Sequence, residues 1–416
     1  MLHFYLCRLE GTIPTEISVF PRLSHLELGG NYLNGSIPSE IANLGVLTYI
    51  ACGLNSIDGT IPVGIGLMTN LEFIGFSYNN IQGSVPSSFT NLIKMEFFSI
   101  RYNQLSAAQE TLDAIASFPR LVAFLVNTNN FAGNFENALF ASSLKLLRLS
   151  DNYFSGDMLL SKVCTLSQLD ELSIYNNLFS GSVPSCIGNL SKLVILDLGY
   201  NYLRGTIPSS MKQLVSLERI ELQTNLFTGN IADVFLTHTL LSTVVFSDNR
   251  FTGNLPTLNT SALIVLVATK NCFSGTLSTS LCSLSSLRTL ALSGLASSSH
   301  CRSSNWLGFT RSIGGDIPFC LFNMPSLEQL YVSGNGIQSK LSELPVTSNL
   351  ENISLSYNRL SGSIPLSIQQ KHDIFMLDLS FNRLLGTIEG MTNYSFNSNV
   401  SIRTNTVLVE ANQLSG

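Results

Sequence analysis

The amino-acid sequence predicts an α/β repeat solenoid, a right-handed superhelix with a parallel β-sheet on its concave side and irregular or 3-10 structure on its convex side. An asparagine recurs between positions 31 and 412, in most cases every 24 residues. Apolar residues alternate directly before each asparagine, and the longest apolar run covers only residues 262–268. Such self-similarity indicates structural units stacked along one axis, here about 17 coils.

Each unit is expected to open with a short strand. The repeat reads LxxLxLxxNxLxGxIPxxLxxL, and its LxL segment has the two-residue period of a strand whose alternate side chains point inward. The residues between and after these core positions would form the concave face. The predicted core positions of the clearest strands are Leu26, Leu28, Leu147, Leu149, Leu172, Ile174, Leu196, Leu198, Leu377 and Leu379.

The asparagine follows the strand, where the chain turns away, and its short amide can satisfy backbone groups of neighbouring coils. One amide per coil predicts a ladder along the solenoid. The glycine four residues later supplies the freedom of a tight turn, and a proline after Ile or Val, as at Pro38, fixes an extended outer segment. Two degenerate units carry Cys7 and Leu295 where asparagine is expected.

Residues 1–416 are expected to form one repeat domain that is truncated at both ends, because no signal peptide precedes the first repeat and the chain stops within a repeat. A non-repeat insertion, residues 294–314, lengthens one unit by about 16 residues at little cost in closure entropy. It holds Trp306, the single tryptophan, with Arg302 and Arg311. Two interpretations stay open: a tolerated surface loop, or a binding segment rich in typical contact residues.

Charge and motifs argue against several functional classes. The formal net charge of -5, without a basic stripe, argues against nucleic acid and against a polybasic membrane patch. No nucleophile elbow, metalloprotease helix, phosphate-binding loop or kinase signature occurs. The sequence therefore predicts a protein that is not an enzyme and holds no cofactor and no metal. Acidic residues of the predicted concave face are expected to be exposed and solvated: Glu27, Asp151, Asp197, Glu221, Asp248 and Asp378.

The eight cysteines form no CxxC pair, so zinc is not expected. Cys52 occupies a core leucine position and should be a small buried hydrophobe. Cys186 and Cys320 share the same position after GxxP, which indicates a position of the repeat rather than a site. Cys301, in the insertion, could bridge to Cys282 or Cys320, and the connectivity stays open.

The GxIP segment inside a 24-residue unit resembles the plant-specific class of leucine-rich repeats. That class is typical of receptor-like kinases, receptor-like proteins and polygalacturonase-inhibitor-like proteins. The same repeat style occurs in kinetoplastid surface antigens of the promastigote type. The resemblance covers nearly the whole chain and implies a leucine-rich repeat fold that binds a ligand. Plant ectodomains carry cysteine caps with a tryptophan before the first repeat, whereas nothing of the kind precedes Leu2.

The position just before the ladder asparagine carries a column of aromatic residues, Tyr78, Tyr102, Tyr200, Tyr357 and Phe381, with Tyr175 one place earlier in its unit. Tyrosine is large, rigid and amphipathic, and is a preferred contact residue. The alternative is a strand surface that favours β-forming residues. The candidate ligand-binding residues are Tyr78, Arg101, Tyr102, Arg148, Tyr175, Tyr200, Glu221, Asp248, Trp306 and Tyr357.

Six glycosylation sequons are compatible with secretion, although a chain this rich in Asn, Ser and Thr contains roughly that number by chance. They are Asn34, Asn189, Asn259, Asn352, Asn393 and Asn399.

Three functional hypotheses follow. The first is a non-catalytic, extracellular ectodomain of a membrane-anchored cell-surface protein, receptor-like or antigen-like, with its anchor in a segment absent from this chain. Its partner would be a protein, peptide or glycan on the concave face. The second is a secreted binding protein of the polygalacturonase-inhibitor type. The third is the targeting arm of a receptor kinase or other enzyme whose catalytic part lies elsewhere.

Overall fold

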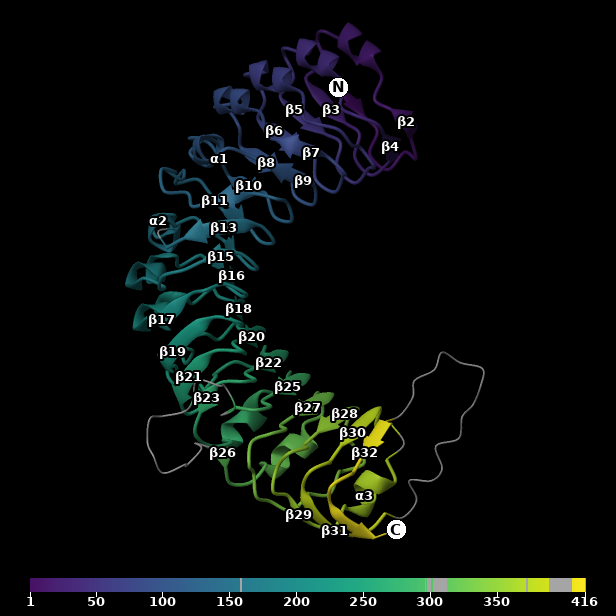
Figure 1. Ribbon diagram of the computed structural model, residues 1–416, viewed down its shortest axis with the longest axis vertical. Coiled ribbons are helices and arrows are strands. Elements are labelled where there is room, and N and C mark those ends of the chain that lie inside the picture. The colour runs from purple at the N-terminus through teal and green to yellow at the C-terminus, as the bar shows by residue number, and fades with distance from the viewer. Residues whose placement is uncertain are drawn as a thin grey trace. The chain divides into compact units, whose positions relative to one another are not determined.

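The computed structural model describes residues 1–157, 159–295, 297, 301, 313–371, 373–388 and 406–415. The chain divides into two compact units, unit 1 (Met1–Arg204) and unit 2 (Gly205–Gly416). In each unit, short strands alternate along the chain with helical turns at the spacing of the repeat (Figure 1). The units share this construction and are described one at a time.

Unit 1 has a parallel sheet in which each strand pairs with the strand of the next coil. The strands keep one register, so Tyr49 pairs with Phe73 and Phe73 with Phe97. The sheet contains β1 (Leu2–His3), β3 (His25–Glu27), β5 (Tyr49–Ala51), β6 (Phe73–Gly75), β8 (Phe97–Ser99), β10 (Ala123–Leu125), β12 (Leu146–Arg148), β14 (Glu171–Ser173) and β16 (Ile195–Asp197).

Unit 2 repeats this arrangement. Its sheet crosses the predicted insertion without a break, because Thr289 of β25 pairs directly with Gln329 of β27. The sheet contains β18 (Arg219–Glu221), β20 (Thr243–Val245), β22 (Val265–Val267), β25 (Thr289–Ala291), β27 (Gln329–Tyr331), β28 (Asn352–Ser354), β30 (Met376–Asp378) and β32 (Thr406–Leu408).

In many coils the side away from the sheet carries a short helix, and this side is called here the helix side. Proline starts many of them: Pro38 lies at φ -69° and ψ 142°, the extended outer segment that the sequence predicts. The helices are η1 (Thr15–Val19), η2 (Ser39–Asn43), η3 (Val63–Leu67), η4 (Ser87–Asn91), α1 (Gln109–Ala116), α2 (Leu159–Val163), η5 (Ser185–Asn189), η6 (Ser209–Gln213), η7 (Thr279–Ser283), η8 (Phe319–Asn323) and α3 (Leu366–Gln369).

A second set of short strands follows the asparagine of many coils and pairs in small parallel ladders of its own. They are β2 (Glu10–Thr12), β4 (Tyr32–Asn34), β7 (Gln82–Ser84), β9 (Gln104–Ser106), β11 (Ala132–Gly133), β13 (Tyr153–Gly156), β15 (Leu178–Phe179), β17 (Arg204–Thr206), β19 (Leu226–Asn230), β21 (Arg250–Gly253), β23 (Cys272–Phe273), β24 (Gly275–Thr276), β26 (Ile313–Gly314), β29 (Ser361–Gly362), β31 (Arg383–Thr387) and β33 (Gln413–Ser415).

The predicted core positions are buried in both units, from Leu26 to Leu379. Phenylalanines two residues after the asparagine add stacked rows inside each unit. In unit 1, the rings of Phe131 and Phe154 lie 6.2 Å apart, and in unit 2 those of Phe227 and Phe251 lie 6.1 Å apart. Stability therefore comes from the interior of the coils, and the solvent side of the sheet is free to vary.

The asparagine ladder is confirmed, as Asn201 illustrates. Its Nδ2 donates to the carbonyl oxygens of Leu198 and Gly199 in its own coil, at 3.2 and 2.9 Å, and to that of Ile174 in the preceding coil at 2.9 Å. Its Oδ1 accepts from the backbone N–H of Phe179 at 3.0 Å. One side chain thus satisfies backbone groups of two coils that would otherwise be buried without partners.

The residue before the ladder asparagine adopts a left-handed conformation, with φ 56° at Tyr78 and 52° at Tyr200. The interpretation of this column as a strand surface that favours β-forming residues is therefore wrong. β6 ends at Gly75, three residues before Tyr78, and the left-handed residue makes the sharp turn that brings Asn79 inward. Gly35 has φ 65°, and a Cβ there would lie 2.8 Å from the Thr12 methyl group of the preceding coil.

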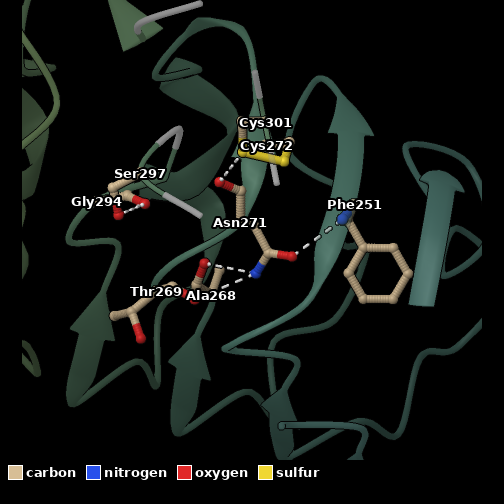
Figure 2. The surroundings of a disulfide bond; sticks show 8 residues. All are labelled: Phe251, Ala268, Thr269, Asn271, Cys272, Gly294, Ser297 and Cys301. Carbon is tan, nitrogen blue, oxygen red and sulfur yellow. Dashed lines mark hydrogen bonds between the residues drawn. A yellow bond between two sulfur atoms is a disulfide. The ribbon is translucent and has the colours of Figure 1, made fainter. Parts of the chain in front are cut away.

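Three disulfides link neighbouring coils: Cys164–Cys186, Cys272–Cys301 and Cys282–Cys320. The expectation that Cys301 pairs with Cys282 or Cys320 is wrong, because Cys282, the fourth residue of η7, and Cys320, the second residue of η8, pair with each other. Figure 2 shows Cys301 joined to Cys272, directly after the ladder residue Asn271. The positions of Cys186 and Cys320 are thus cross-linking sites, whereas Cys52 is buried and free as predicted.

Candidate functional site

An aromatic row lies on the solvent side of the unit 1 sheet, defined here as His25, Tyr49, Phe73 and Phe97. Each is the first residue of its strand, and the register brings consecutive members side by side. Their rings are stacked, with centroid distances of 4.0, 4.1 and 4.5 Å along the row. All four side chains are half-buried, so an aromatic edge faces solvent in four successive coils.

A carboxylate lies beneath the start of this row. Glu27 accepts hydrogen bonds from the Tyr49 hydroxyl and from the Gly29 N–H, both at 2.8 Å. Burial, together with the hydrogen bond to Glu27, raises the pKa of the Tyr49 phenol above its usual range. Burial lowers the pKa of the His25 imidazole. The expectation that Glu27 is solvated is wrong, because its side chain is only 8% exposed beneath its aromatic neighbour.

A second group, called here the Tyr–Arg cluster, comprises Tyr78, Arg101 and Tyr102. The two tyrosine rings are stacked with their centroids 4.2 Å apart. The Arg101 guanidinium carbon lies 5.2 Å from the centroid of the Tyr78 ring, a cation–π contact. Both tyrosines remain more than a third exposed. The structure thus brings together three of the residues that the sequence predicts for binding.

Small residues separate the aromatic row from the Tyr–Arg cluster. Ala51, Gly75 and Ser99 occupy equivalent places on three adjacent strands, and Gly53 and Ser77 follow two of those strands. A Cβ at Gly75 would lie 2.8 Å from the Phe73 ring, which therefore rests against the backbone there. This small-residue strip leaves the two aromatic groups as the prominent features of the face.

Three polar atoms near Arg101 are buried without a hydrogen-bond partner among the described residues. They are Nε of Arg101, Oδ1 of Asn127 and Oγ1 of Thr128. Asn127 is the counterpart of Arg101 in the next coil, and Thr128 follows it. Unsatisfied buried polar atoms each cost about 1–3 kcal/mol, so their gathering beside an exposed aromatic cluster marks this place on the sheet.

Arg148 has an internal partner. Its Nε and an Nη donate to the two carboxylate oxygens of Glu171 at 2.7 and 2.6 Å, and Glu171 is buried. Such bidentate pairing holds both side chains on the sheet. The solvent side of unit 1 therefore offers Arg148 as part of an ion pair, whereas among the described residues Arg101 has no ionic partner.

The other predicted residues lie in separate places. In unit 1, the rings of Tyr175 and Tyr200 meet edge to face at 5.0 Å. In unit 2, Lys270 pairs with Asp248 at 3.5 Å, and Tyr357 stacks on Phe381 at 4.2 Å.

The prediction that Glu221 is exposed to solvent is wrong. Its side chain is buried and accepts hydrogen bonds from the Arg219 Nε at 2.6 Å and from the Gln223 Nε2 at 3.0 Å. These neighbouring side chains cover Glu221, and its negative charge is balanced by Arg219 within the sheet.

Several predictions fall on residues that the structure leaves undescribed. Trp306, Asn393 and Asn399 lie outside the described residues, as does most of the predicted insertion. Of the other sequons, Asn34, Asn189 and Asn259 are exposed, and Asn352 is half-buried on β28.

Reasoning from the sequence missed the aromatic row. The prediction considered the position just before the asparagine, whereas His25, Tyr49, Phe73 and Phe97 come directly before the first leucine of the LxL segment. Aligning the coils on that position would have found four aromatic rings in succession. In the described residues, no group of His, Cys, Asp and Glu is arranged to hold a metal ion. Among the same residues, no helix has the length and apolarity to span a membrane.

Comparison with known families identifies the repeat. A model described as "Leucine rich repeat" matches residues 167–227. A second, described as "Leucine Rich Repeat", matches residues 22–44, 70–92 and 349–370. No curated protein matches the chain in a sequence comparison.

Solved structures show the same architecture. The plant peptide hormone receptor RGFR1, in complex with RGF2, is 26% identical with a TM-score of 0.80, over 98% of this chain and 62% of its own. The ectodomain of the Arabidopsis thaliana receptor kinase GASSHO1/SCHENGEN3, in complex with CASPARIAN STRIP INTEGRITY FACTOR 2, has the same identity, score and coverage of this chain, over 50% of its own length. The Arabidopsis receptor kinase HAESA, with the peptide hormone IDA and the co-receptor SERK1, is 26% identical with a TM-score of 0.73, over 98% and 73%. This chain thus spans between half and two thirds of the length of the first two.

Proposed function

We propose that this chain, a leucine-rich repeat protein of the plant extracellular type, is the ligand-binding ectodomain of a membrane-anchored cell-surface protein. It binds a protein or peptide on the solvent side of its sheets. The observation that carries the proposal is the aromatic row of unit 1. Its rings lie on the solvent side of the sheet, outside the interior of the coils, and a continuous exposed aromatic surface is typical of a place where a partner binds.

Two further observations support the proposal. Solved structures of similar architecture are receptor ectodomains in complex with peptide hormones. In this chain, three disulfides clip neighbouring coils together. Disulfides persist in oxidising compartments, so their number favours a location outside the cytosol. Leucine-rich repeat folds of this kind serve as binding modules, and the proposal assigns this chain no catalytic role.

The experiment compares two matched sets of substitutions in neighbouring coils. The full chain, with disulfides intact, is immobilised and screened against displayed peptides of twelve residues. One variant carries Phe73→Ala and Phe97→Ala on the sheet. The other carries Val63→Ala and Leu67→Ala on η3, where both side chains are more than two thirds exposed. We expect the sheet variant to bind the selected peptides at least about tenfold more weakly, and the helix-side variant to bind them unchanged.

Circular dichroism and thermal unfolding confirm that both variants keep the fold. Selected peptides that lose affinity for the helix-side variant and keep it for the sheet variant would contradict the proposed surface. Failure to select any peptide above an uncoated support would contradict the proposed function itself.

A further inference from the structure

We propose that the Tyr–Arg cluster and the aromatic row together receive an acidic segment of a protein partner, with a carboxylate on Arg101 and apolar side chains along the aromatic rings. This inference rests on the proposed function and names the chemistry of the partner. It depends on the charge of Arg101, on the unsatisfied atoms beside it and on the way in which the rings are stacked.

Charge complementarity indicates an anion. Among the described residues on the solvent sides of the two sheets, Arg148, Arg219 and Lys270 each pair with a carboxylate, whereas Arg101 lies over the Tyr78 ring without an ionic partner. The Glu27 carboxylate of unit 1 is also satisfied, because it accepts hydrogen bonds from the Tyr49 hydroxyl and the Gly29 N–H. Arg101 therefore gives the middle of this face an unneutralised positive charge.

The unsatisfied atoms indicate that the partner also donates hydrogen bonds. Arg101 Nε is a donor that needs an acceptor, whereas Asn127 Oδ1 is an acceptor that needs a donor. Both atoms are buried in the free chain, so neither water nor a partner reaches them until the side chains above them move aside. A peptide segment supplies both kinds of group within a few ångströms, a side-chain carboxylate for Arg101 and a backbone N–H for Asn127.

The stacking favours a peptide over a sugar or a nucleobase. Rings in the aromatic row stack face to face, with centroids 4.0–4.5 Å apart. The Tyr78 ring stacks on the Tyr102 ring and also contacts the Arg101 guanidinium. Ligands with flat faces bind open aromatic faces. Ring edges beside the small-residue strip instead suit branched or aromatic side chains, which pack edge to face against them. Exposed Leu54, before Tyr78 in the same column, extends this apolar border.

The test uses the full chain with its disulfides intact and a displayed library of random twelve-residue peptides, selected at physiological salt so that long-range charge effects are screened. We expect the selected peptides to carry Asp or Glu next to Phe, Tyr, Leu or Ile. Changing that residue to Asn or Gln should weaken binding by about tenfold to a hundredfold, as expected for a charge-assisted hydrogen bond. Arg101→Gln should weaken binding by a similar factor, and the two changes together should weaken it little further.

Arg120→Gln is the matched control, because it removes the same charge from an exposed position in the turn between α1 and β10. Its affinity for the peptides should equal that of the natural chain. Arg101→Lys keeps the charge and loses the planar guanidinium, so binding should fall between the natural chain and Arg101→Gln. It also separates loss of the charge from any loss of folding, which unfolding midpoints of all three variants monitor.

Peptides that bind Arg101→Gln as tightly as the natural chain, or that are rich in basic residues, would overturn this inference and leave the proposed function standing. Binding to a glycan array with no selected peptide would overturn both. Selected acidic peptides whose affinity depends on Arg101 and not on Arg120 would support both.

Discussion

The two units carry the same ladder of asparagines and opposite kinds of solvent-side surface. In β3, β5, β6 and β8 of unit 1 the first strand position carries His25, Tyr49, Phe73 and Phe97, whereas β20, β22 and β25 of unit 2 have Thr243, Val265 and Thr289 there. Unit 2 has instead a row of hydroxyls, Ser247, Thr269, Ser293, Ser333, Ser356 and Ser380.

Hydroxyls of unit 2 bond to other hydroxyls, to backbone N–H groups and to carboxylates. Ser333 and Ser354 share a hydrogen bond of 2.7 Å, and Ser380 donates to Asp378 at 2.6 Å. In unit 1 the Nε of Arg101 and the Oδ1 of Asn127 are buried without a hydrogen-bond partner, and in unit 2 the Oε1 of Gln223, in the equivalent column, is likewise unsatisfied. One scaffold thus supports a surface with a row of stacked aromatic rings and a surface with a row of hydroxyls, because the coil interior alone fixes the fold.

The largest expected effect tests whether the two units share their scaffold. Asn79→Leu in unit 1 and Asn358→Leu in unit 2 each remove a side chain that bonds backbone groups of two coils. Because each stranded group costs about 1–3 kcal/mol, both should lose about 3 kcal/mol or more of unfolding free energy. Denaturant unfolding measures this loss. Asn80→Leu, exposed and adjacent, should change little, and an unaltered midpoint for Asn79→Leu would refute the shared ladder.

The next effect concerns the disulfide bonds. Among the described residues, unit 2 has two of them and unit 1 has one. Replacing Cys282 and Cys320 together with alanine should reduce stability by about 2–4 kcal/mol, because the unfolded chain gains freedom. Hydrogen exchange read by mass spectrometry should place the loss of protection in unit 2. Cys7→Ala, at an exposed free thiol, is the control. An equal loss of hydrogen-exchange protection in both units would show that the Cys282–Cys320 disulfide does not stabilise unit 2 in particular.

A smaller effect separates two arginines of the same face. Arg148→Met leaves the buried Glu171 without its bidentate donor and should cost about 1–2 kcal/mol, discounted because Arg148 is partly exposed. Arg101→Met breaks no ion pair and should change stability by less than about 0.5 kcal/mol. Chemical unfolding of both variants is the measurement. A larger loss for Arg101→Met would mean that this residue holds the fold and not a partner.

The smallest effect is a pH dependence. His238 of unit 2 is fully buried, its Nε2 lies 3.1 Å from the Met211 carbonyl oxygen, and burial lowers its pKa. Since the unfolded imidazole titrates near its ordinary value of 6.5, the unfolded state binds more protons just below that pH. This contribution to stability is complete above pH 6.5 and is lost as the pH falls towards the lowered folded value. Thermal unfolding from pH 7.5 to 5 should show a weaker slope for His238→Gln. A parallel slope would assign the dependence to other groups.

The fold was predictable because its determinants are local and repeated. Leu26, Leu28 and Asn31 recur in spacing and have the same environment in each coil, so one unit predicts the rest. The candidate site was predictable only in part. Tyr78, Arg101 and Tyr102 followed from residue type and position, but their left-handed turn and mutual stacking depend on contacts between coils.

Burial of charges was harder to predict than position. Glu27 and Glu221 occupy outward positions of their strands, yet Tyr49 covers one, and Arg219 with Gln223 covers the other. Repeat spacing tells which way a side chain points but not how far its neighbours extend over it. The same holds for Cys301, whose partner depends on which sulfur atoms the coils bring together.

The direct pairing of β25 with β27 has a consequence for how the chain folds. Thr289 and Gln329 are 40 residues apart in sequence, so this pairing closes a longer loop than the usual coil. Loop length adds only slowly to the closure entropy, about 0.5 kcal/mol here, but non-local contacts slow folding. Once Cys282 and Cys320 are joined, Thr289 lies seven residues from one sulfur and Gln329 nine from the other. Oxidation thus converts this distant pairing into a short-range one. In chains whose Cys282–Cys320 disulfide forms before folding, β25 and β27 should therefore pair as fast as the strands of two ordinary neighbouring coils.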